Sequence, residues 1–143
     1  MDKLIVVGDA ARQIAKTLSE NGKPVLATRR VHAGQHAILT TQNDDYYVLF
    51  KRAPYLDYGR EIGDDNGAGE TINNHTLQAI LSNPRIRLLL FAYPNGDVYA
   101  IPPREFNAHA TSHLTKKTGE TSLCVEMKRL KPLNEALLNE PAN

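Results

Sequence analysis

The sequence predicts an α/β domain with a mixed central sheet flanked by helices. Three observations favour this class: an apolar stripe at helical spacing in residues 9–21, two apolar runs around a polar turn in residues 35–52, and a helical pattern followed by an apolar run in residues 70–93. A chain of 143 residues can bury one core without disulfide or metal support, so we expect a single domain spanning residues 1–143.

The composition excludes some classes of protein and leaves others open. A formal net charge of +1 gives no argument for a polyanionic partner, although local basic patches are still possible. Cys124 is the single cysteine, which excludes an intramolecular disulfide and a multi-cysteine zinc site and favours a reducing compartment. The apolar run 4–7 is too short for a signal peptide or a membrane span. We therefore expect a cytoplasmic protein without a membrane partner.

The first elements are a helix and a strand. In residues 9–21, Ile14 and Leu18 share one face, and Gly22 follows the expected end of the helix. Residues 1–8 fit either a strand or an early helical turn. Residues 24–31 have the β-branched and apolar content of a strand.

The next stretch, residues 35–52, predicts a hairpin. Apolar runs at 37–39 and 46–50 flank the turn-forming side chains 42–45. Lys51 and Arg52 follow the second run directly, so two cations stand at the exit of a strand that is apolar on both faces. They either extend into solvent or belong to a functional site.

Residues 53–69 are rich in acids and turn formers without a sustained period, which predicts a long acidic loop. A helix over 70–83, a strand over 85–93, a turn at 94–97 and a paired strand over 98–101 are expected next. Pro102 and Pro103 begin a short helix that extends to Leu114, and residues 122–125 form a last strand. The tail 134–143 is expected to be flexible, with a frayed helix at most.

The order helix, three strands, helix and strand from residue 9 to residue 93 resembles the common core of the PD-(D/E)XK nuclease superfamily. This superfamily includes restriction endonucleases, archaeal Holliday junction resolvases and some intron-encoded endonucleases. Residues 88–106 also resemble the stretch in which such small nucleases run a strand, a turn and a second strand into a proline-marked helix. The resemblance implies a restriction-endonuclease-like core in the order αβββαβ.

The resemblance also implies a site. In the family, the second strand opens with an acid, and the third carries an acid two positions before a lysine; the carboxylates hold a divalent cation that activates water. By position, Lys51 matches the family's lysine, whereas Leu49 stands in place of the acid. Gln35 or His36 stands near the other acidic position.

A family-like site would therefore recruit its acids from elsewhere in the chain. The candidates are Glu70 in the next predicted helix, Asp57 or Glu61 in the acidic loop, and Glu20 in the first helix. In the leading hypothesis, Lys51 stabilises the reacting phosphate, while Glu70 with Asp57 or Glu61 holds Mg²⁺ or Mn²⁺. Residues 125–128 contain a second acid-x-lysine spacing, which occurs too late for the family's order.

Further residues are candidates for contacts to a nucleic-acid backbone. Gly67, Gly69 and Thr71 lie in a glycine segment that leads into the predicted helix, where free backbone amides favour an anion. Thr71 or Asn73 could instead simply cap that helix. The basic residues of the predicted phosphate-contacting surface are Arg52, Lys116 and Lys117.

The sequence thus predicts a nucleic-acid-acting protein of nuclease descent, with DNA as the expected partner. Small nucleases of this kind often form homodimers to act on two strands, which the resemblance implies here. The alternative is a non-catalytic module for nucleic-acid binding or protein assembly. In that alternative, the acidic segment 57–70 docks onto a basic partner surface.

Overall fold

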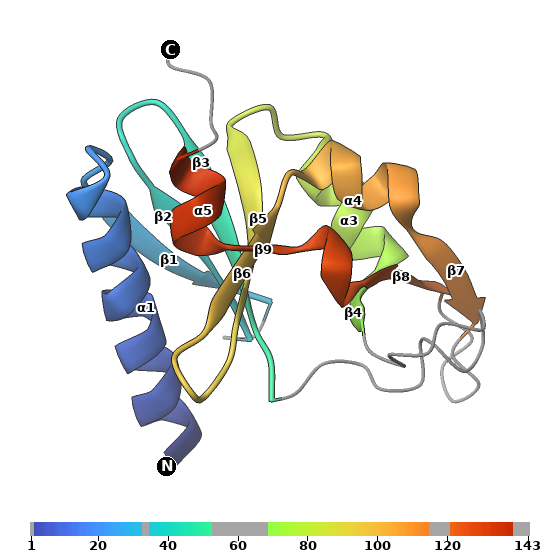
Figure 1. Ribbon diagram of the computed structural model, residues 1–143, viewed down its shortest axis with the longest axis horizontal. Coiled ribbons are helices and arrows are strands. Elements are labelled where there is room, and N and C mark those ends of the chain that lie inside the picture. Colours follow the sequence, from blue (N-terminus) through green and yellow to red (C-terminus); the bar gives the residue numbers. More distant parts are fainter. Residues whose placement is uncertain (1, 33–34, 53–68, 115–120, 139–143) are drawn as a thin grey trace.

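The computed structural model describes residues 2–32, 35–52, 69–114 and 121–138 (Figure 1). The helices are α1 (Asp2–Glu20), α3 (Asn74–Leu81), α4 (Pro103–His109), α5 (Leu133–Leu138) and the 3₁₀ helix η1 (Met127–Arg129). The strands are β1 (Ala27–Val31), β2 (His36–Thr40), β3 (Asp45–Phe50), β4 (Gly69–Asn73), β5 (Ile86–Ala92), β6 (Val98–Ile101), β7 (Thr111–Leu114), β8 (Thr121–Glu126) and β9 (Lys131–Pro132).

Two sheets build the fold. The large sheet has the strand order β1-β2-β3-β5-β6-β9, in which β3 and β5 are parallel and every other neighbouring pair is antiparallel. The small sheet has the order β4-β8-β7 and is antiparallel. The protein is therefore a mixed α/β fold with a mixed sheet and flanking helices, as the sequence predicts.

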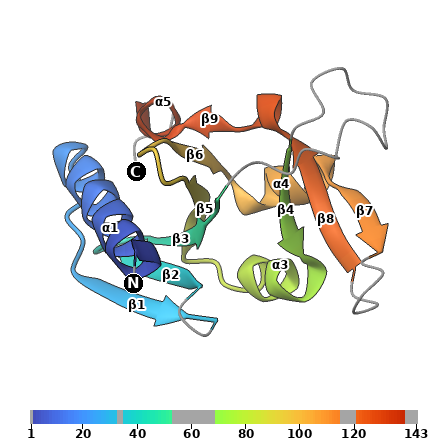
Figure 2. The ribbon, with the colours of Figure 1, turned by 90° about the horizontal axis from the view of Figure 1, so that it is seen from below.

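Both faces of the large sheet are buried at its central strands β3 and β5. Along β3, Tyr47 and Leu49 pack in one hydrophobic cluster and Tyr46 and Val48 in another, because successive strand residues point to opposite faces. The first cluster includes residues of α3, α4 and the small sheet, and the second includes residues of α1 and α5. Figure 2 shows α1 on one side of the large sheet and α3, α4 and the small sheet on the other.

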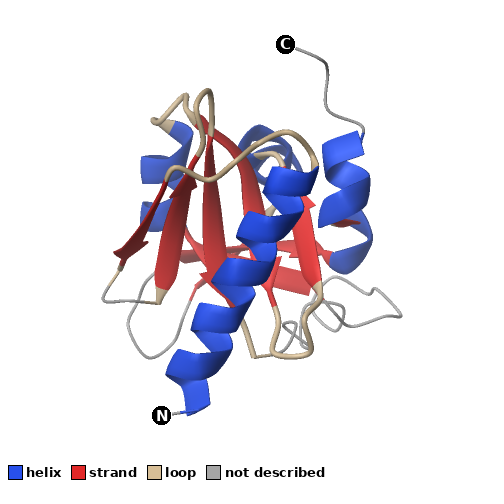
Figure 3. Ribbon diagram, turned by 90° about the vertical axis from the view of Figure 1, so that its left-hand side faces the viewer, coloured by secondary structure: helices blue, strands red, loops and turns tan. Residues whose placement is uncertain are grey.

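The amphipathic face of α1 lies against the large sheet. Ile14 and Leu18 are buried there, as their helical spacing predicts. Figure 3 shows α1 crossing the strands of this sheet. The helix begins at Asp2, which decides between the two possibilities for residues 1–8 in favour of helix from that residue onward.

The two predicted hairpins are confirmed. Between β2 and β3, the Thr41 amide donates to the Asp44 carbonyl at 2.8 Å, and the Thr41 hydroxyl donates to the same oxygen at 2.8 Å. Between β5 and β6, the Gly96 amide donates to the Tyr93 carbonyl at 3.0 Å. Gly96 has a φ of 96°, a conformation that a side chain would strain.

The helix predicted over residues 70–83 is wrong in its first turn. Residues 69–73 form β4, in which Glu70 pairs with Val125 and Ile72 with Leu123 of β8. Helix α3 begins only at Asn74, and the Asn73 side chain caps it by accepting from the His75 amide at 2.8 Å. Pairing with a strand distant in sequence outweighed the local helical pattern.

Other predicted boundaries also change. Because β4 lies between β3 and α3, the order αβββαβ is not reproduced as predicted. The short helix α4 ends at His109, and Leu114 belongs to β7. Residues 134–138 of the predicted tail lie in α5, where Leu137 is buried, whereas 139–143 fall outside the described residues. Across the described ranges, no helix combines the length and apolar character that crossing a membrane requires.

Candidate functional site

The candidate site lies where the parallel strands β3 and β5 end. The Lys51 amide donates to the Ala92 carbonyl at 2.8 Å and so extends the pairing of these strands by one residue. Since Tyr47 and Leu49 face the small sheet, the alternation of β3 directs Lys51 to the same side. The same period carries β5 from Phe91 to Tyr93, so both strands end with a polar side chain between the two sheets.

Glu70 completes this group from the small sheet, and we call Lys51, Glu70 and Tyr93 the Lys51–Glu70 cluster. The Lys51 Nζ atom lies 3.7 Å from Glu70 Oε1 and donates to the Thr71 carbonyl at 2.9 Å. The Tyr93 hydroxyl donates to Glu70 Oε2. The Glu70 side chain is 1% exposed, and that of Lys51 is 23% exposed, so the cation has the only direct path to solvent within this pair.

Burial shifts the proton affinities of the cluster. Desolvation lowers the pKa of Lys51, while the Glu70 carboxylate opposes part of that shift. Desolvation likewise raises the pKa of Glu70 against the opposing effects of Lys51 and the Tyr93 hydrogen bond. The pKa of Tyr93 is raised by burial and by donation to Glu70. The cluster therefore contains an amine and an acid that are both easier to neutralise than in water.

Two histidines and a tyrosine lie on the same side of the sheet. The His36 Nδ1 atom is 2.7 Å from the Tyr47 hydroxyl, and the His32 and His36 rings stack with centroids 4.7 Å apart. Burial, then His32, then Lys51 lower the pKa of His36 to about 4. His36 is thus a neutral imidazole at neutral pH, placed within electrostatic range of Lys51.

A cavity of about 370 Å³ opens beside the cluster. Arg52, Tyr93, Tyr99 and Met127 are among its lining residues. The Met127 sulfur lies 3.9 Å from the Tyr93 hydroxyl, so this cavity is separated from Glu70 by little more than one side chain. Arg52 is exposed and supplies a cation at the cavity wall.

The structure brings together some predicted site residues and leaves others undecided. Lys51 and Glu70 meet, and Gly69 and Thr71 lie with Glu70 in β4. The basis for an anion site at Gly67–Thr71 was a helix N-terminus, and this basis is wrong because the segment leads into a strand. Asp57, Glu61, Gly67, Lys116 and Lys117 fall outside the described residues.

The described part of the cluster does not by itself fit a divalent cation. Mg²⁺ and Mn²⁺ need several oxygen ligands, yet Glu70 is the one carboxylate here, and Lys51 and Tyr93 already contact its two oxygens. Over the described ranges of the chain, no three His, Cys, Asp or Glu side chains are grouped so that they could hold a metal. A cation at this position would need further acids, for which Asp57 and Glu61 were the predicted candidates.

Sequence reasoning missed Tyr93 and the contact between His36 and Tyr47. A signal was present for Tyr93, because it continues the alternation of Leu89 and Phe91 at the end of a predicted strand. The burial of Glu70 had a similar signal, because in a strand Glu70 and Ile72 point to the same face. That signal could be recognised only if residues 69–73 were known to be a strand.

The second acid-x-lysine spacing forms a different kind of pair. Glu126 ends β8, Lys128 lies in η1, and their charged atoms are 3.0 Å apart. The Lys128 side chain is 63% exposed, so this pair lies at the surface.

Comparison with known proteins gives no family for this chain: no family model, no curated protein and no solved structure matches it.

Proposed function

We propose that the protein acts on nucleic acid at the Lys51–Glu70 cluster, as an endonuclease of restriction-endonuclease-like descent. The observation that carries this proposal is the pairing of Lys51 with Glu70 at the ends of β3 and β5. Leu49 occupies the family's acidic position, and Glu70 brings a carboxylate to the lysine from a different strand.

The arrangement of the strands supports the same proposal. Strands β1, β2 and β3 form an antiparallel meander, and the chain crosses through α3 to β5, which is parallel to β3. The resemblance implies a crossover of this kind between the third and fourth core strands, although β4 interrupts the implied order here. In open α/β sheets, ligands bind beyond the carboxyl ends of parallel strands, and the cluster lies at that position.

The chemistry assigned to Lys51 follows from its surroundings. Its partly exposed ammonium can contact a phosphate oxygen, and Arg52 beside it adds a second exposed cation. Phosphodiester cleavage builds negative charge on the phosphate, which a fixed cation stabilises. Glu70 holds the Lys51 side chain in position, and Tyr93 holds Glu70. A bound Mg²⁺ or Mn²⁺ would supply an activated water, with Asp57 or Glu61 as its additional ligands.

A non-catalytic role is the second candidate, and one observation favours it. Both oxygens of Glu70 already have partners, and the side chain is 1% exposed. A buried carboxylate whose two oxygens both have partners is typical of a structural ion pair. The cluster would then stabilise a nucleic-acid-binding or assembly module, and residues 57–70 would be its docking segment.

A cleavage assay on duplex, branched and single-stranded nucleic acid with Mg²⁺ or Mn²⁺ tests the proposal. We expect cleavage that a chelator abolishes and that Lys51→Ala reduces at least about a hundredfold, as loss of one charge-stabilising group typically does. Lys128→Ala is the matched control, since it removes a surface lysine from another acid pair, and it should cleave like the unaltered protein.

Two results would count against the proposal. Cleavage that survives Lys51→Ala would exclude Lys51 as the catalytic lysine. Absence of cleavage by a protein whose circular dichroism shows it to be folded would favour the second candidate. In that case substitution of Asp57, Glu61, Asp64 and Asp65 by their amides should abolish partner binding, whereas Lys51→Ala should leave it unchanged. Sedimentation of the protein with and without duplex would test the expected homodimer.

A further inference from the structure

A groove of about 550 Å³ lies at the opposite end of β5 from the Lys51–Glu70 cluster. The end of α3, the start of β5, the end of β6 and the start of α4 form it, and η1, β9 and α5 contribute to its wall. Its volume is in the range of sites that enclose small ligands or a few side chains. The cleavage proposal assigns no role to this groove.

The lining of the groove combines an aliphatic surface with a cationic rim. Its apolar residues include the half-buried Leu81 and the exposed Pro84 and Pro102, with the buried Ile86 and Leu88 beneath them in the core. No aromatic side chain is among the described residues that line it. An aliphatic surface in an open groove favours an occupant that carries an aliphatic group, because covering it removes apolar area from water.

Three of the cations in this lining are available for an external anion. Arg104, Arg129 and Lys131 are exposed, and their side chains have no hydrogen bond or ion pair to the part of the chain that the structure describes. Arg87 also lines the groove, but its guanidinium lies 4.0 Å from Asp44. Glu105 is the one acid among the described lining residues, so the cations outnumber it.

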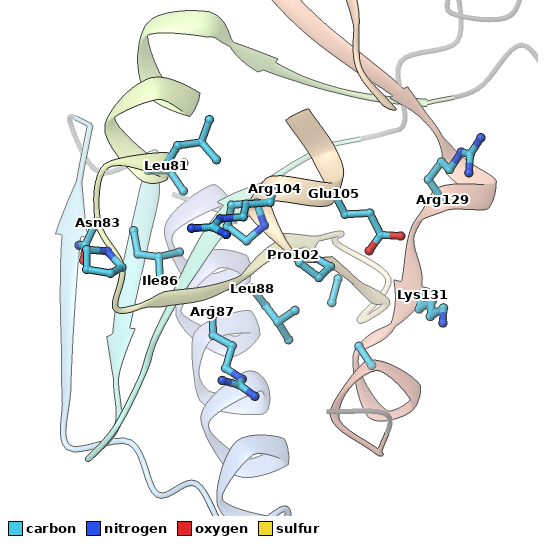
Figure 4. A pocket seen from close by; sticks show the side chains of 15 residues that line it. Leu81, Asn83, Ile86, Arg87, Leu88, Pro102, Arg104, Glu105, Arg129 and Lys131 are labelled. Atoms are coloured by element: carbon cyan, nitrogen blue, oxygen red, sulfur yellow. The ribbon is translucent and has the colours of Figure 1, made fainter. Parts of the chain in front are cut away.

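Figure 4 shows how these side chains are arranged. Arg104 extends from α4 toward the wall formed by α3 and the start of β5, whereas Arg129 and Lys131 stand at the other side of the groove. Leu88 lies between these sides. The cations therefore stand around the aliphatic surface and do not form one compact site, which suits an extended ligand with several negative charges better than a single small anion.

Two polyanionic occupants can be distinguished by this lining. A single-stranded nucleic acid would satisfy the cations, but its bases bind on aromatic side chains, and the described lining has none. An acidic peptide with an aliphatic side chain satisfies both features, because its carboxylates pair with arginine and its aliphatic group covers the apolar lining residues that remain open to solvent, Leu81, Pro84 and Pro102. We propose that this groove binds an acidic, aliphatic peptide segment of a partner protein.

Fluorescence anisotropy with a labelled EELLEE peptide tests this proposal on the full-length chain. We expect saturable binding with a dissociation constant on the order of 100 μM, as befits a short, flexible peptide. The EESSEE peptide, which lacks the aliphatic group, and the QQLLQQ peptide, which lacks the charges, should each bind at least about tenfold more weakly. Oligothymidylate is the probe for nucleic acid.

Variants of the protein locate the binding. Arg104→Glu with Lys131→Glu should weaken EELLEE binding at least about tenfold and should improve binding of a KKLLKK peptide. Arg12→Glu with Lys16→Glu is the matched control, because these residues are exposed on α1, away from the groove. This control pair should bind EELLEE like the unaltered protein. Thermal unfolding of each variant confirms that it is folded.

Several results would overturn the proposal. Equal binding of EELLEE and EESSEE, or tighter binding of oligothymidylate that is also lost in the groove variant, would identify a general polyanion surface. Absence of saturable EELLEE binding, or an equal loss in the α1 control, would exclude the groove as the site. Cleavage activity should be unchanged in the groove variant, so failure of this proposal is distinguishable from failure of the nuclease proposal.

Discussion

Two lysine–glutamate pairs in this protein have the same chemistry and different surroundings. Lys128 and Glu126 are 3.0 Å apart, with side chains 63% and 19% exposed. Lys51 and Glu70 are 3.7 Å apart, with side chains 23% and 1% exposed. Water screens the first pair, whereas the second has replaced most of its hydration by contacts to each other, to Thr71 and to Tyr93. The pair with the shorter distance is therefore the one whose disruption should cost less free energy of unfolding.

The comparison also shows that the acid-x-lysine spacing alone does not identify a functional site. The acid-x-lysine pattern occurs literally at residues 126–128, yet that pair lies at the surface. Lys51 lacks such an acid in its own strand and obtains Glu70 from the small sheet. Environment, and not sequence spacing, separates a candidate site from a surface ion pair.

The largest expected difference between the pairs is in stability. Glu70→Ala should lower the free energy of unfolding by about 3 kcal/mol, because it leaves the Lys51 ammonium without its counter-charge and the Tyr93 hydroxyl without its acceptor. Glu126→Ala should change it by no more than about 0.5 kcal/mol. Urea unfolding measures both. Equal effects of the two substitutions would show that burial does not make one pair more important for stability than the other.

Removal of the Tyr93 hydroxyl should have an intermediate effect on the free energy of unfolding. Tyr93→Phe should lower the free energy of unfolding by about 1.5 kcal/mol, because a buried carboxylate loses its hydrogen-bond donor while the ring packing is kept. Tyr99→Phe is the matched control in the neighbouring ring, whose centroid is 5.9 Å from that of Tyr93, and it should change stability by less than about 0.5 kcal/mol. If Tyr93→Phe left the free energy of unfolding unchanged, Glu70 would not depend on this hydrogen-bond donor.

A third expected effect is a change in the pH dependence of stability at His36. Because its pKa in the folded protein is lowered from 6.5 to about 4, the unfolded chain binds more protons between these values. His36 therefore contributes a stability that is complete above pH 6.5 and decreases as the pH falls toward about 4. Lys51 and His32 lie near it and oppose its protonation.

Urea midpoints measured across this pH window test the prediction. His36→Gln should flatten the rise of stability with pH relative to the unaltered protein. An unchanged slope in His36→Gln would show that this imidazole titrates as it does in the unfolded chain.

Local patterns predicted much of the fold. The hairpin of β2 and β3 followed from apolar runs around the polar residues 42–45, and the turn at Gly96 followed from its residue types. The β4 strand could not be predicted in this way, because its pattern near Ile72 also fits a helix. Its partner, β8, lies about fifty positions later in the chain, so local sequence carries no direct sign of the pairing.

The candidate site was predictable to a similar extent. Lys51 stood out because a cation follows a strand that is buried on both faces. Glu70 was one of several possible acids, and its selection depended on where β4 would lie. The groove near Arg104 was not predictable, because its lining residues come from seven elements and become neighbours only in the folded chain.

By itself, the sequence determined the α/β class, the amphipathic face of α1, both hairpins and the position of Lys51 at a strand end. These features depend on hydrophobic periodicity and turn chemistry, which act over a few residues. Only the tertiary structure decided that Glu70 is a buried strand residue, that Tyr93 donates to it, and that Arg104, Arg129 and Lys131 border one groove. The physical reason is that desolvation and ion pairing depend on neighbours in space, which the packing of the two sheets creates.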